Sequence, residues 1–458
     1  MERFDVAIVG GGPAGSSAGH AAASAGASAV IFEKGVPRTD RPDRLGPDST
    51  DAAGILDYWV DIMGIHPDEM PDGVVLGELD RAEFIGPAES LVLRETGIES
   101  SYDGFGFCMH RARFDDFLRD RAEAAGATYR VGTSVRSVET DRDADAGPRH
   151  SLALGDGESI GADFLILADG PQRQVTNRVL DEYLPFDVTE RLSTRETNHI
   201  AYQEHRRLPD EVYAEVAGAI KFWWGHMPGH TAYPWIFPND DNVARIGLTM
   251  PIGLELDGVE NREDYPLLRP DDERIPQGQE YVRRLLEYEY GDEYDVDEDF
   301  PIVTGRGKSE GTETYAISST RPIDSPTAAG IAVVGGAMGA TSAFHEGGDH
   351  TAVRTGAIAG ELAAEGDLTP YNDRWKDAIG DEILRNVAMA DVVRDYEPDD
   401  WDWAFATART LLDESDGYHL FDVNNVRAGF SAARLIASYK RTKFSFRNGR
   451  YVQLAESE

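Results

Sequence analysis

A glycine-rich turn between an apolar strand and an alanine-rich helix constrains the fold more than any other feature of the chain. Residues 4–9 have the pattern of a buried strand and lead into the turn Gly10–Gly15, which has the spacing Gly-x-Gly-x-x-Gly. Residues 16–26 then read as a helix and residues 29–32 as a second strand. This order is typical of the βαβ unit that binds dinucleotides. The sequence therefore predicts an α/β protein that begins with a Rossmann-like unit.

Each position of this unit has its own physical role. Gly10 permits the tight turn, Gly12 lets the backbone approach a pyrophosphate, and Gly15 lets helix and strand pack closely. The helix begins beside Ala14 and offers free N–H groups and a positive dipole end to the phosphates. Glu33 ends the second strand, where an acidic side chain accepts hydrogen bonds from ribose hydroxyls. Such a unit could hold either NAD or FAD, and later segments decide between them.

Two later motifs favour FAD. Arg111 opens the string Arg-Ala-Arg-Phe-Asp-Asp-Phe-Leu, at the start of a helix expected over residues 113–125 with Gly126 as its C-cap. An apolar strand later ends in Asp169–Gly170. Both motifs resemble those of FAD-dependent hydroxylases and reductases. The resemblance implies that Arg111 contacts FAD, that the backbone of Val135 touches the adenine, and that the Asp-Gly pair forms a tight turn near the cofactor. An ordinary helix-start arginine is the alternative interpretation.

A glycine motif in the last third of the chain departs from that group. The resembling flavoproteins have Gly-Asp-Ala-x-Gly after a strand, then a proline and Gly-Gly-Ile. This chain has Gly335–Gly339, then Ala343 and Gly347–Asp349 at the same spacing. Gly336 replaces the aspartate that binds the ribityl chain, a loss expected to weaken FAD binding. Asp349 replaces a residue whose backbone faces the flavin pyrimidine ring, so its carboxylate would either disfavour an anionic reduced flavin or supply a new ribityl contact.

The most discriminating segment is aromatic. It reads Tyr233-Pro-Trp235-Ile-Phe237-Pro238 and is followed eight residues later by Gly247. Alternation along a strand places the three rings on one face. The string resembles the Tyr-x-Trp-x-Phe-Pro signature of geranylgeranyl reductases, which implies an apolar slot for an isoprenoid chain beside the flavin. The alternative is an aromatic strand packed in a core.

The chain is strongly acidic, with 83 Asp and Glu against 44 Lys and Arg and a net charge of −39. A nucleic-acid partner is not expected, because such binders need a basic stripe. An acidic excess spread along the chain, with only six lysines, is typical of salt-loving organisms, where salt screens self-repulsion. The locally basic segment Arg434–Arg450 is the candidate surface for peripheral membrane contact.

Length and composition favour a multidomain protein. No apolar stretch reaches the ~20 residues of a membrane span, and the N-terminus has no signal-peptide pattern, so we expect a cytoplasmic protein, free or peripheral at the inner membrane face. A single cysteine, Cys108, excludes a disulfide or a cysteine metal cluster within the chain, and no metal site is expected. A helix pattern covers residues 50–63, and helical periodicity covers residues 370–440.

The expected fold class is α/β, with a Rossmann-like FAD-binding domain, an inserted α+β substrate domain as in p-hydroxybenzoate hydroxylase, and a helical C-terminal region. The expected boundaries are 1–75, 104–177 and 320–365 for the first, 76–103 and 178–319 for the second, and 366–458 for the third. The residues expected to hold FAD are Gly10, Gly12, Ala14, Gly15, Glu33, Lys34, Arg111, Val135, Asp169, Gly336, Gly348 and Asp349. The substrate slot is expected at Tyr233, Trp235 and Phe237.

Taken together, the motifs resemble the geranylgeranyl reductase branch of the FAD-dependent hydroxylase-like proteins, as a divergent member of haloarchaeal type. The resemblance implies reduction of prenyl double bonds of lipids by reduced FAD, with NAD(P)H or ferredoxin as the electron donor. Family members often carry Cys-Gly-Gly after the ribose-binding strand, whereas Arg44–Ser49 contains no cysteine. We therefore assign no catalytic residue beyond the flavin. An FAD-dependent monooxygenase and a non-catalytic flavin-fold binding protein remain alternatives.

Restoring the missing aspartate should strengthen cofactor binding. We expect Gly336→Asp to bind FAD about tenfold more tightly, because a hydrogen bond to a charged group contributes about 1.5 kcal/mol or more. Titration of the cofactor-free protein with FAD, followed by quenching of flavin fluorescence, measures this. An unchanged dissociation constant would contradict the role given to position 336.

Overall fold

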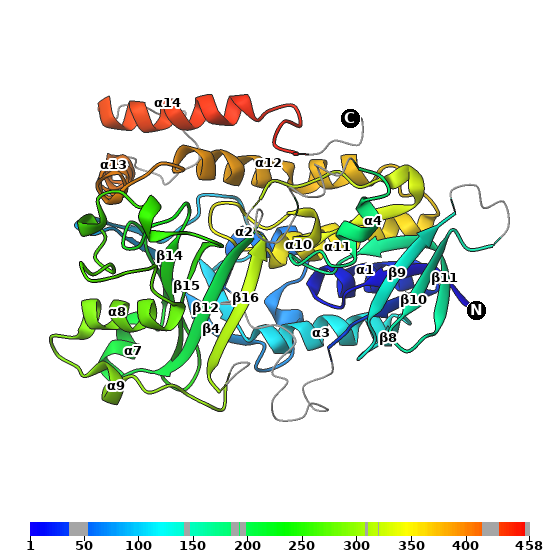
Figure 1. Cartoon of the computed structure of the whole chain (residues 1–458), viewed down its shortest axis with the longest axis horizontal. Helices are drawn as coiled ribbons and strands as arrows, with labels where there is room; N and C mark the ends of the chain where they lie inside the picture. The colour runs from blue at the N-terminus through cyan, green and yellow to red at the C-terminus, as the bar shows by residue number, and fades with distance from the viewer. Residues whose placement is uncertain are drawn as a thin grey trace.

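The computed structural model describes residues 1–35, 54–141, 147–184, 192, 198–306, 310–318, 320–414 and 430–453. Within these ranges the chain forms two large sheets, one small sheet and a set of helices. Figure 1 shows the two large sheets side by side, with the C-terminal helices along one edge of the molecule. The expected α/β class, with a Rossmann-like unit, a second sheet and C-terminal helices, is confirmed.

The first large sheet carries the glycine-rich turn. Its strand order is β8-β2-β1-β11-β10-β9, and β17 also pairs with β11. β1 pairs in parallel with both β2 and β11, and its residues Val6–Val9 are buried, as expected for a parallel strand covered on both faces. The strands span Glu2–Val9 (β1), Ala29–Phe32 (β2), Thr128–Arg130 (β8), Val135–Thr140 (β9), His150–Leu154 (β10), Ser159–Leu167 (β11) and Ile331–Val333 (β17).

Two helices of this domain lie unusually close to each other. In α11 (Asp349–Glu365), a Cβ added at Gly356 would lie 2.0 Å from the carbonyl oxygen of Ala14 in α1 (Pro13–Ser24). A Cβ added at Gly360, one turn later, would lie 2.2 Å from the carbonyl oxygen of Ala18. The two backbones are therefore in direct contact, which only glycine permits at these positions. The shorter helices α4 (Thr176–Leu180) and α10 (Gly335–Met338) also belong to this region.

The second large sheet has the order β16-β12-β15-β14-β13-β5-β6. It is antiparallel except for the pair β13 and β5. The strands span Arg81–Ile85 (β5), Ser90–Leu93 (β6), Asn198–Arg207 (β12), Ala219–Trp223 (β13), Tyr233–Pro238 (β14), Val243–Pro251 (β15) and Thr312–Ser318 (β16). In β14, Ile236 joins the apolar core shared with α8 (Gly278–Tyr290), whereas Tyr233, Trp235 and Phe237 belong to a separate apolar cluster. The alternation expected for this strand is therefore present.

One helix expectation is wrong at its start. Residues 54–56 form the strand β3 (Gly54–Leu56), and α2 begins only at Asp57 and ends at Met63. Pairing of β3 with β7 (Gly106–Met109) overrides the helical periodicity, since the strand satisfies its backbone groups across a sheet that also includes β4 (Val75–Leu79). Residues 50–53 lie outside the described residues.

The helix after Arg111 also differs from the expected bounds. The helix α3 spans Arg111–Ala124, so it begins two residues earlier than expected. His110 precedes it, and its Nδ1 accepts a bond from the backbone N–H of Arg113 at 3.4 Å. The C-cap is Ala125, and Gly126 follows in the left-handed conformation with φ of 105°.

Three helices follow the Rossmann-like domain and lie at one edge of the molecule (Figure 1): α12 (Tyr371–Val392), α13 (Pro398–Glu414) and α14 (Phe430–Ser445). Short elements elsewhere are α7 (Asp210–Val216), α9 (Val296–Asp299), and the 3-10 turns Pro67–Glu69, Leu256–Gly258, Arg262–Asp264 and Thr327–Ala329. Among the helices of the described ranges, none combines the length and apolarity needed to cross a membrane.

The contact between α1 and α11 predicts a large cost for one added methyl group. We expect Gly356→Ala to lower the free energy of unfolding by about 3 kcal/mol, because the new Cβ meets backbone that cannot rotate away. Urea unfolding of the cofactor-free protein measures this. The exposed Arg354 of the same helix provides the control, since Arg354→Ala should change stability by no more than about 0.5 kcal/mol. Equal, small effects of both changes would contradict the close contact.

Candidate functional site

A cavity of about 610 Å³ lies where the Rossmann-like sheet meets the aromatic face of the second sheet. Fourteen of the residues singled out in the sequence line it: Gly10, Gly12, Ala14, Glu33, Lys34, Arg111, Val135, Asp169, Tyr233, Trp235, Phe237, Gly336, Gly348 and Asp349. Gly15 does not line it. A Cβ on Gly15 would lie 1.9 Å from the carbonyl oxygen of Gly10, so this glycine closes the turn from behind.

One end of the cavity has the features that a pyrophosphate requires. A Cβ added at Gly12 would have no atom within 4 Å, so space remains open beside this backbone. The N-terminus of α1 follows, with Pro13 in its first turn and no side chain capping its N–H groups. The N-terminus of α11 at Gly348 also lacks a side-chain cap and lies in the wall of the same cavity. Free N–H groups at two helix N-termini favour bound anionic groups.

The carboxylate of Glu33 is held in place beside this end. The backbone N–H groups of Gly11 and Gly35 donate to its two oxygens at 2.8 and 2.6 Å. The carboxylate is therefore fixed at the wall of the cavity, at the position expected for a ribose contact. The open space at Gly12, the uncapped helix ends and the oriented carboxylate together fit the ADP half of FAD.

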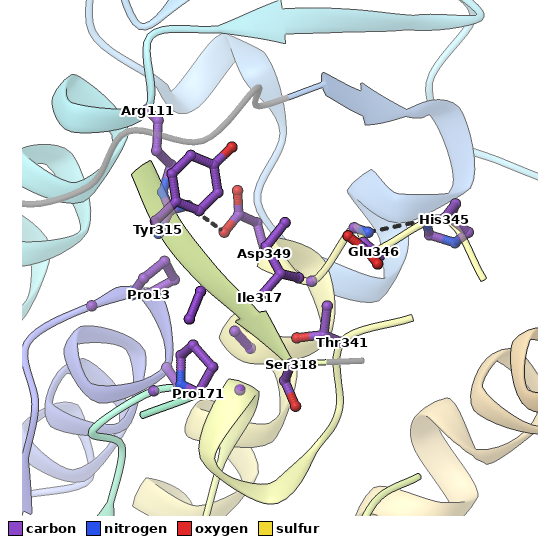
Figure 2. A pocket seen from close by; sticks show the side chains of 18 of the residues that line it. Pro13, Arg111, Pro171, Tyr315, Ile317, Ser318, Thr341, His345, Glu346 and Asp349 are labelled. Carbon is purple, nitrogen blue, oxygen red and sulfur yellow. Dashed lines mark hydrogen bonds and ion pairs between the residues drawn. The ribbon is translucent and has the colours of Figure 1, made fainter. Parts of the chain in front are cut away.

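Arg111 and Asp349, which the sequence assigned separately to the cofactor, form an ion pair in the wall of the cavity (Figure 2). Nη1 of Arg111 lies 3.0 Å from Oδ1 of Asp349, and Nε lies 3.0 Å from Oδ1 of Asp115. All three side chains are buried or nearly so. The negative charge at position 349 therefore has a positive partner, which weakens its expected repulsion of an anionic flavin.

The turn after β11 is stabilised by two side chains. Asp169 accepts hydrogen bonds from the backbone N–H groups of Val175 at 2.7 Å and Thr176 at 3.1 Å, so it caps the start of α4. Arg173, which the sequence analysis missed, is 1% exposed and donates to the carbonyl oxygens of Ala337 at 2.8 Å and Gly336 at 3.1 Å. Burial lowers the pKa of this guanidinium to about 10. In the sequence, only the closeness of Arg173 to the Asp169–Gly170 turn could have indicated that this residue belongs to the site.

Position 336 is crowded. A Cβ added there would lie 3.3 Å from Cδ of Pro171, so an aspartate requires a shift of a few tenths of an ångström. The carbonyl oxygen of Gly336 is already used by Arg173. The glycine therefore fits the local packing as well as departing from the family motif.

The other half of the cavity is aromatic. The ring of Trp224 lies 4.3 Å from that of Tyr233 and 5.2 Å from that of Phe344, between centroids. The rings of Trp235 and Phe237 lie 6.5 Å apart and perpendicular. All five side chains line the cavity. This wall is suited to an extended apolar chain and offers few groups that bind water.

The loop between α10 and α11 joins the two halves. The phenol of Tyr233 donates a hydrogen bond to the carbonyl oxygen of His345 at 2.8 Å. Trp59 of α2 stacks on His350 at 4.1 Å and on His345 at 5.0 Å. The aromatic strand, α2 and α11 therefore all fix this loop, which also carries Glu346.

Cys108 and the segment Arg44–Ser49 are the two places at which a reactive cysteine was considered. Cys108 is fully buried in β7 and is not part of the cavity wall, and burial raises the pKa of its thiol to about 11. It is therefore suited to packing and not to nucleophilic attack. The segment Arg44–Ser49, where family members often carry a cysteine, lies outside the described residues.

Burial of His345 predicts an acid-sensitive fold. Burial lowers the pKa of His345 to about 3 from an ordinary 6.5, so below pH 6.5 the unfolded chain takes up a proton that the folded chain does not. We expect stability to fall as the pH drops from 6.5 to about 3, at up to about 1.4 kcal/mol per pH unit from this group. Thermal unfolding at several pH values should show a shallower decline for His345→Gln. Parallel declines in both proteins would contradict this.

Comparisons with known proteins agree with this geometry. The family model for tryptophan halogenases matches residues 87–220. Curated relatives include a digeranylgeranylglycerophospholipid reductase of Methanopyrus kandleri, 27% identical over 84% of this chain and 90% of the relative. Another of the same name, from Methanococcoides burtonii, is 25% identical over 88% and 86%.

Solved structures share the fold over almost the whole chain. A geranylgeranyl bacteriochlorophyll reductase-like protein of Thermoplasma acidophilum superimposes with a TM-score of 0.67 and 19% identity, covering 98% of this chain and 99% of that one. A flavin-dependent brominase superimposes with a TM-score of 0.58 and 17% identity over 97% and 100%. These full-length similarities, together with the order of the motifs around one cavity, show that the chain is an FAD-dependent oxidoreductase of this fold that is similar to the geranylgeranyl reductases.

Proposed function

We propose that the protein reduces isolated double bonds of prenyl lipids with electrons from reduced FAD. The observation that carries this proposal is that the cofactor motifs and the aromatic wall line one cavity. The curated relatives, which are named as reductases of digeranylgeranylglycerophospholipids, support the substrate class. Bound FAD would accept two electrons from a donor and supply a hydride to the alkene.

The chain's own residues bind and orient the reactants. Gly12 and the N-terminus of α1 would hold the pyrophosphate, Glu33 the ribose, and the pair of Arg111 and Asp349 would face the flavin end. The rings of β14 would hold the prenyl chain extended and exclude water from the reacting carbons. An isolated alkene has no polar group to bind, so shape and apolar contact must position it.

Access to a lipid substrate implies contact with a membrane surface. Six basic residues and no acidic residue lie between positions 433 and 453, in and after α14: Arg434, Lys440, Arg441, Lys443, Arg447 and Arg450. Phe444 within this segment is 68% exposed. A basic helix with an exposed aromatic ring is suited to anionic lipid headgroups, and we propose this surface for peripheral contact.

NAD(P)H and ferredoxin are the two electron donors that we propose to compare as sources of electrons for the bound FAD.

A second candidate is an FAD-dependent monooxygenase of the same fold. The match to the tryptophan halogenase family model over residues 87–220 favours it, since halogenases also use reduced flavin. A flavin-fold protein that binds lipid without turnover is the third candidate, and the glycine at position 336 favours it.

One anaerobic experiment separates the three. FAD-loaded protein is reduced with dithionite and mixed with geranylgeranyl lipid in anionic vesicles, and the absorbance of oxidised flavin is followed. We expect the oxidised band to return and mass spectrometry to show a more saturated lipid. Trp235→Ala should slow this step at least about tenfold, because a large part of the apolar wall is lost.

Other outcomes would support the alternatives. No reoxidation by lipid, followed by substrate hydroxylation on admission of air, would identify a monooxygenase. Lipid binding without FAD binding would identify a non-catalytic protein. Neutral vesicles serve as the control for the basic surface, and equal rates in neutral and anionic vesicles at low salt would contradict its role.

A further inference from the structure

Glu346 has a backbone conformation that its side chain disfavours. Its φ is 57°, in the left-handed region that favours glycine. The two residues that follow it are glycines, yet position 346 itself is a glutamate. A non-glycine residue in this region is uncommon, and such positions cluster at functional sites. The side chain of Glu346 is 2% exposed and lies in the wall of the cavity (Figure 2). The strain therefore places a carboxylate at the junction between the cofactor end and the aromatic wall.

This carboxylate is also poorly satisfied. Its one ion-pair contact within the described ranges is with Nδ1 of His199, 2.5 Å from Oε1, and neither oxygen accepts a hydrogen bond of normal geometry there. His199 comes from β12 of the second sheet, its side chain is 7% exposed, and its Nδ1 lies 3.4 Å from the hydroxyl of Thr249. A buried, unsatisfied carboxylate requires an explanation, because its desolvation is costly.

The loop holds Glu346 in a fixed orientation. Its backbone N–H donates to the carbonyl oxygen of Ser342 at 3.1 Å, and the hydroxyl of Ser342 accepts from the backbone N–H of Phe344 and His345 at 3.2 and 3.1 Å. On the other side, Tyr233 donates to the carbonyl oxygen of His345. The carboxylate is therefore positioned as a reacting group must be.

We propose that Glu346, backed by His199, is the acid that delivers a proton to the alkene. This inference rests on the proposed function. The double bond gains one hydride from the reduced cofactor and one proton from the Glu346–His199 pair, and the two new C–H bonds replace the π bond. The pair loses one proton and regains it from solvent. Rings in the same cavity wall, such as that of Trp235, would stabilise the carbon that carries positive charge after proton transfer.

Other groups at this junction are poorer acids. Burial raises the pKa of Tyr233 well above its usual range, and its phenol proton is engaged with the carbonyl oxygen of His345. Burial lowers the pKa of His345 to about 3, so this ring is neutral near pH 7. His230 also interacts electrostatically with Glu346; burial lowers the pKa of His230, and its Nε2 contacts the carbonyl oxygen of Ala390.

The test compares single-turnover rates of reduced, FAD-loaded protein mixed anaerobically with geranylgeranyl lipid. We expect Glu346→Gln to slow flavin reoxidation at least about 100-fold, as for loss of a general acid, with FAD and lipid dissociation constants unchanged. The rate of the wild type should vary with pH through ionisation of the pair, and Glu346→Gln should lose this variation. Glu313→Gln is the matched control, because it removes a buried carboxylate of β16, in the sheet that carries His199, and Glu313 does not line the cavity.

A stability measurement separates a catalytic role from a structural one. Glu346→Gly should raise the midpoint of thermal unfolding, since glycine adopts the left-handed conformation without strain, and should still lose the rate. In the cofactor-free wild type, infrared difference spectra between acid and neutral pH should contain a carboxyl band that Glu346→Gln removes. Such a readout does not depend on turnover.

The outcomes are distinct. If lipid does not reoxidise the wild-type flavin, the proposed function fails and this inference fails with it. If the wild type is reoxidised and Glu346→Gln reacts at the same rate with the same pH profile, only the inference is wrong. A rate loss in Glu346→Gln accompanied by equal loss in Glu313→Gln would also overturn it.

Discussion

The direct backbone contact between α1 and α11 is the constraint on which the site depends. Gly356 and Gly360 let α11 approach the carbonyl oxygens of Ala14 and Ala18, and no larger residue fits at either position. As a result, the uncapped N-termini of both helices open onto the same cavity. Two positive helix ends beside one open glycine backbone are suited to the anionic pyrophosphate of a dinucleotide.

The second half of the site comes from a different sheet, and one loop connects the two. Strand β14 presents its rings to the cavity, and the first of them, Tyr233, holds the loop between α10 and α11 by its hydroxyl. The same loop continues into the N-terminus of α11. The aromatic wall and the glycine-rich end of the cavity are therefore connected through this loop, which carries Glu346.

The sequence predicted the parts of the structure that depend on local chemistry. The turn Gly10–Gly15 and the alternation in β14 were readable because each requires particular residues at fixed spacing. The start of α2 was misread because residues 54–56 have a helical pattern but pair with β7 instead. Local periodicity cannot show which segment pairs with which.

Contacts between distant residues could not be predicted at all. Arg111 and Asp349 were assigned separately to the cofactor, and only the fold shows that they pair. His199 and Glu346 lie on different domains of the expected organisation, and no motif contains either. In the sequence, only the two glycines that follow Glu346 could have drawn attention to this residue. The left-handed backbone conformation of Glu346 is visible only in the structure.

We propose that one cavity holds FAD and a prenyl chain together. A crystal structure of the protein with FAD and a geranylgeranyl lipid tests this most directly. We expect the pyrophosphate at Gly12 and the N-terminus of α1, the prenyl chain against Trp235 and Phe237, and the reacting double bond beside Glu346. A lipid bound elsewhere, with the aromatic wall packed shut over FAD, would contradict it.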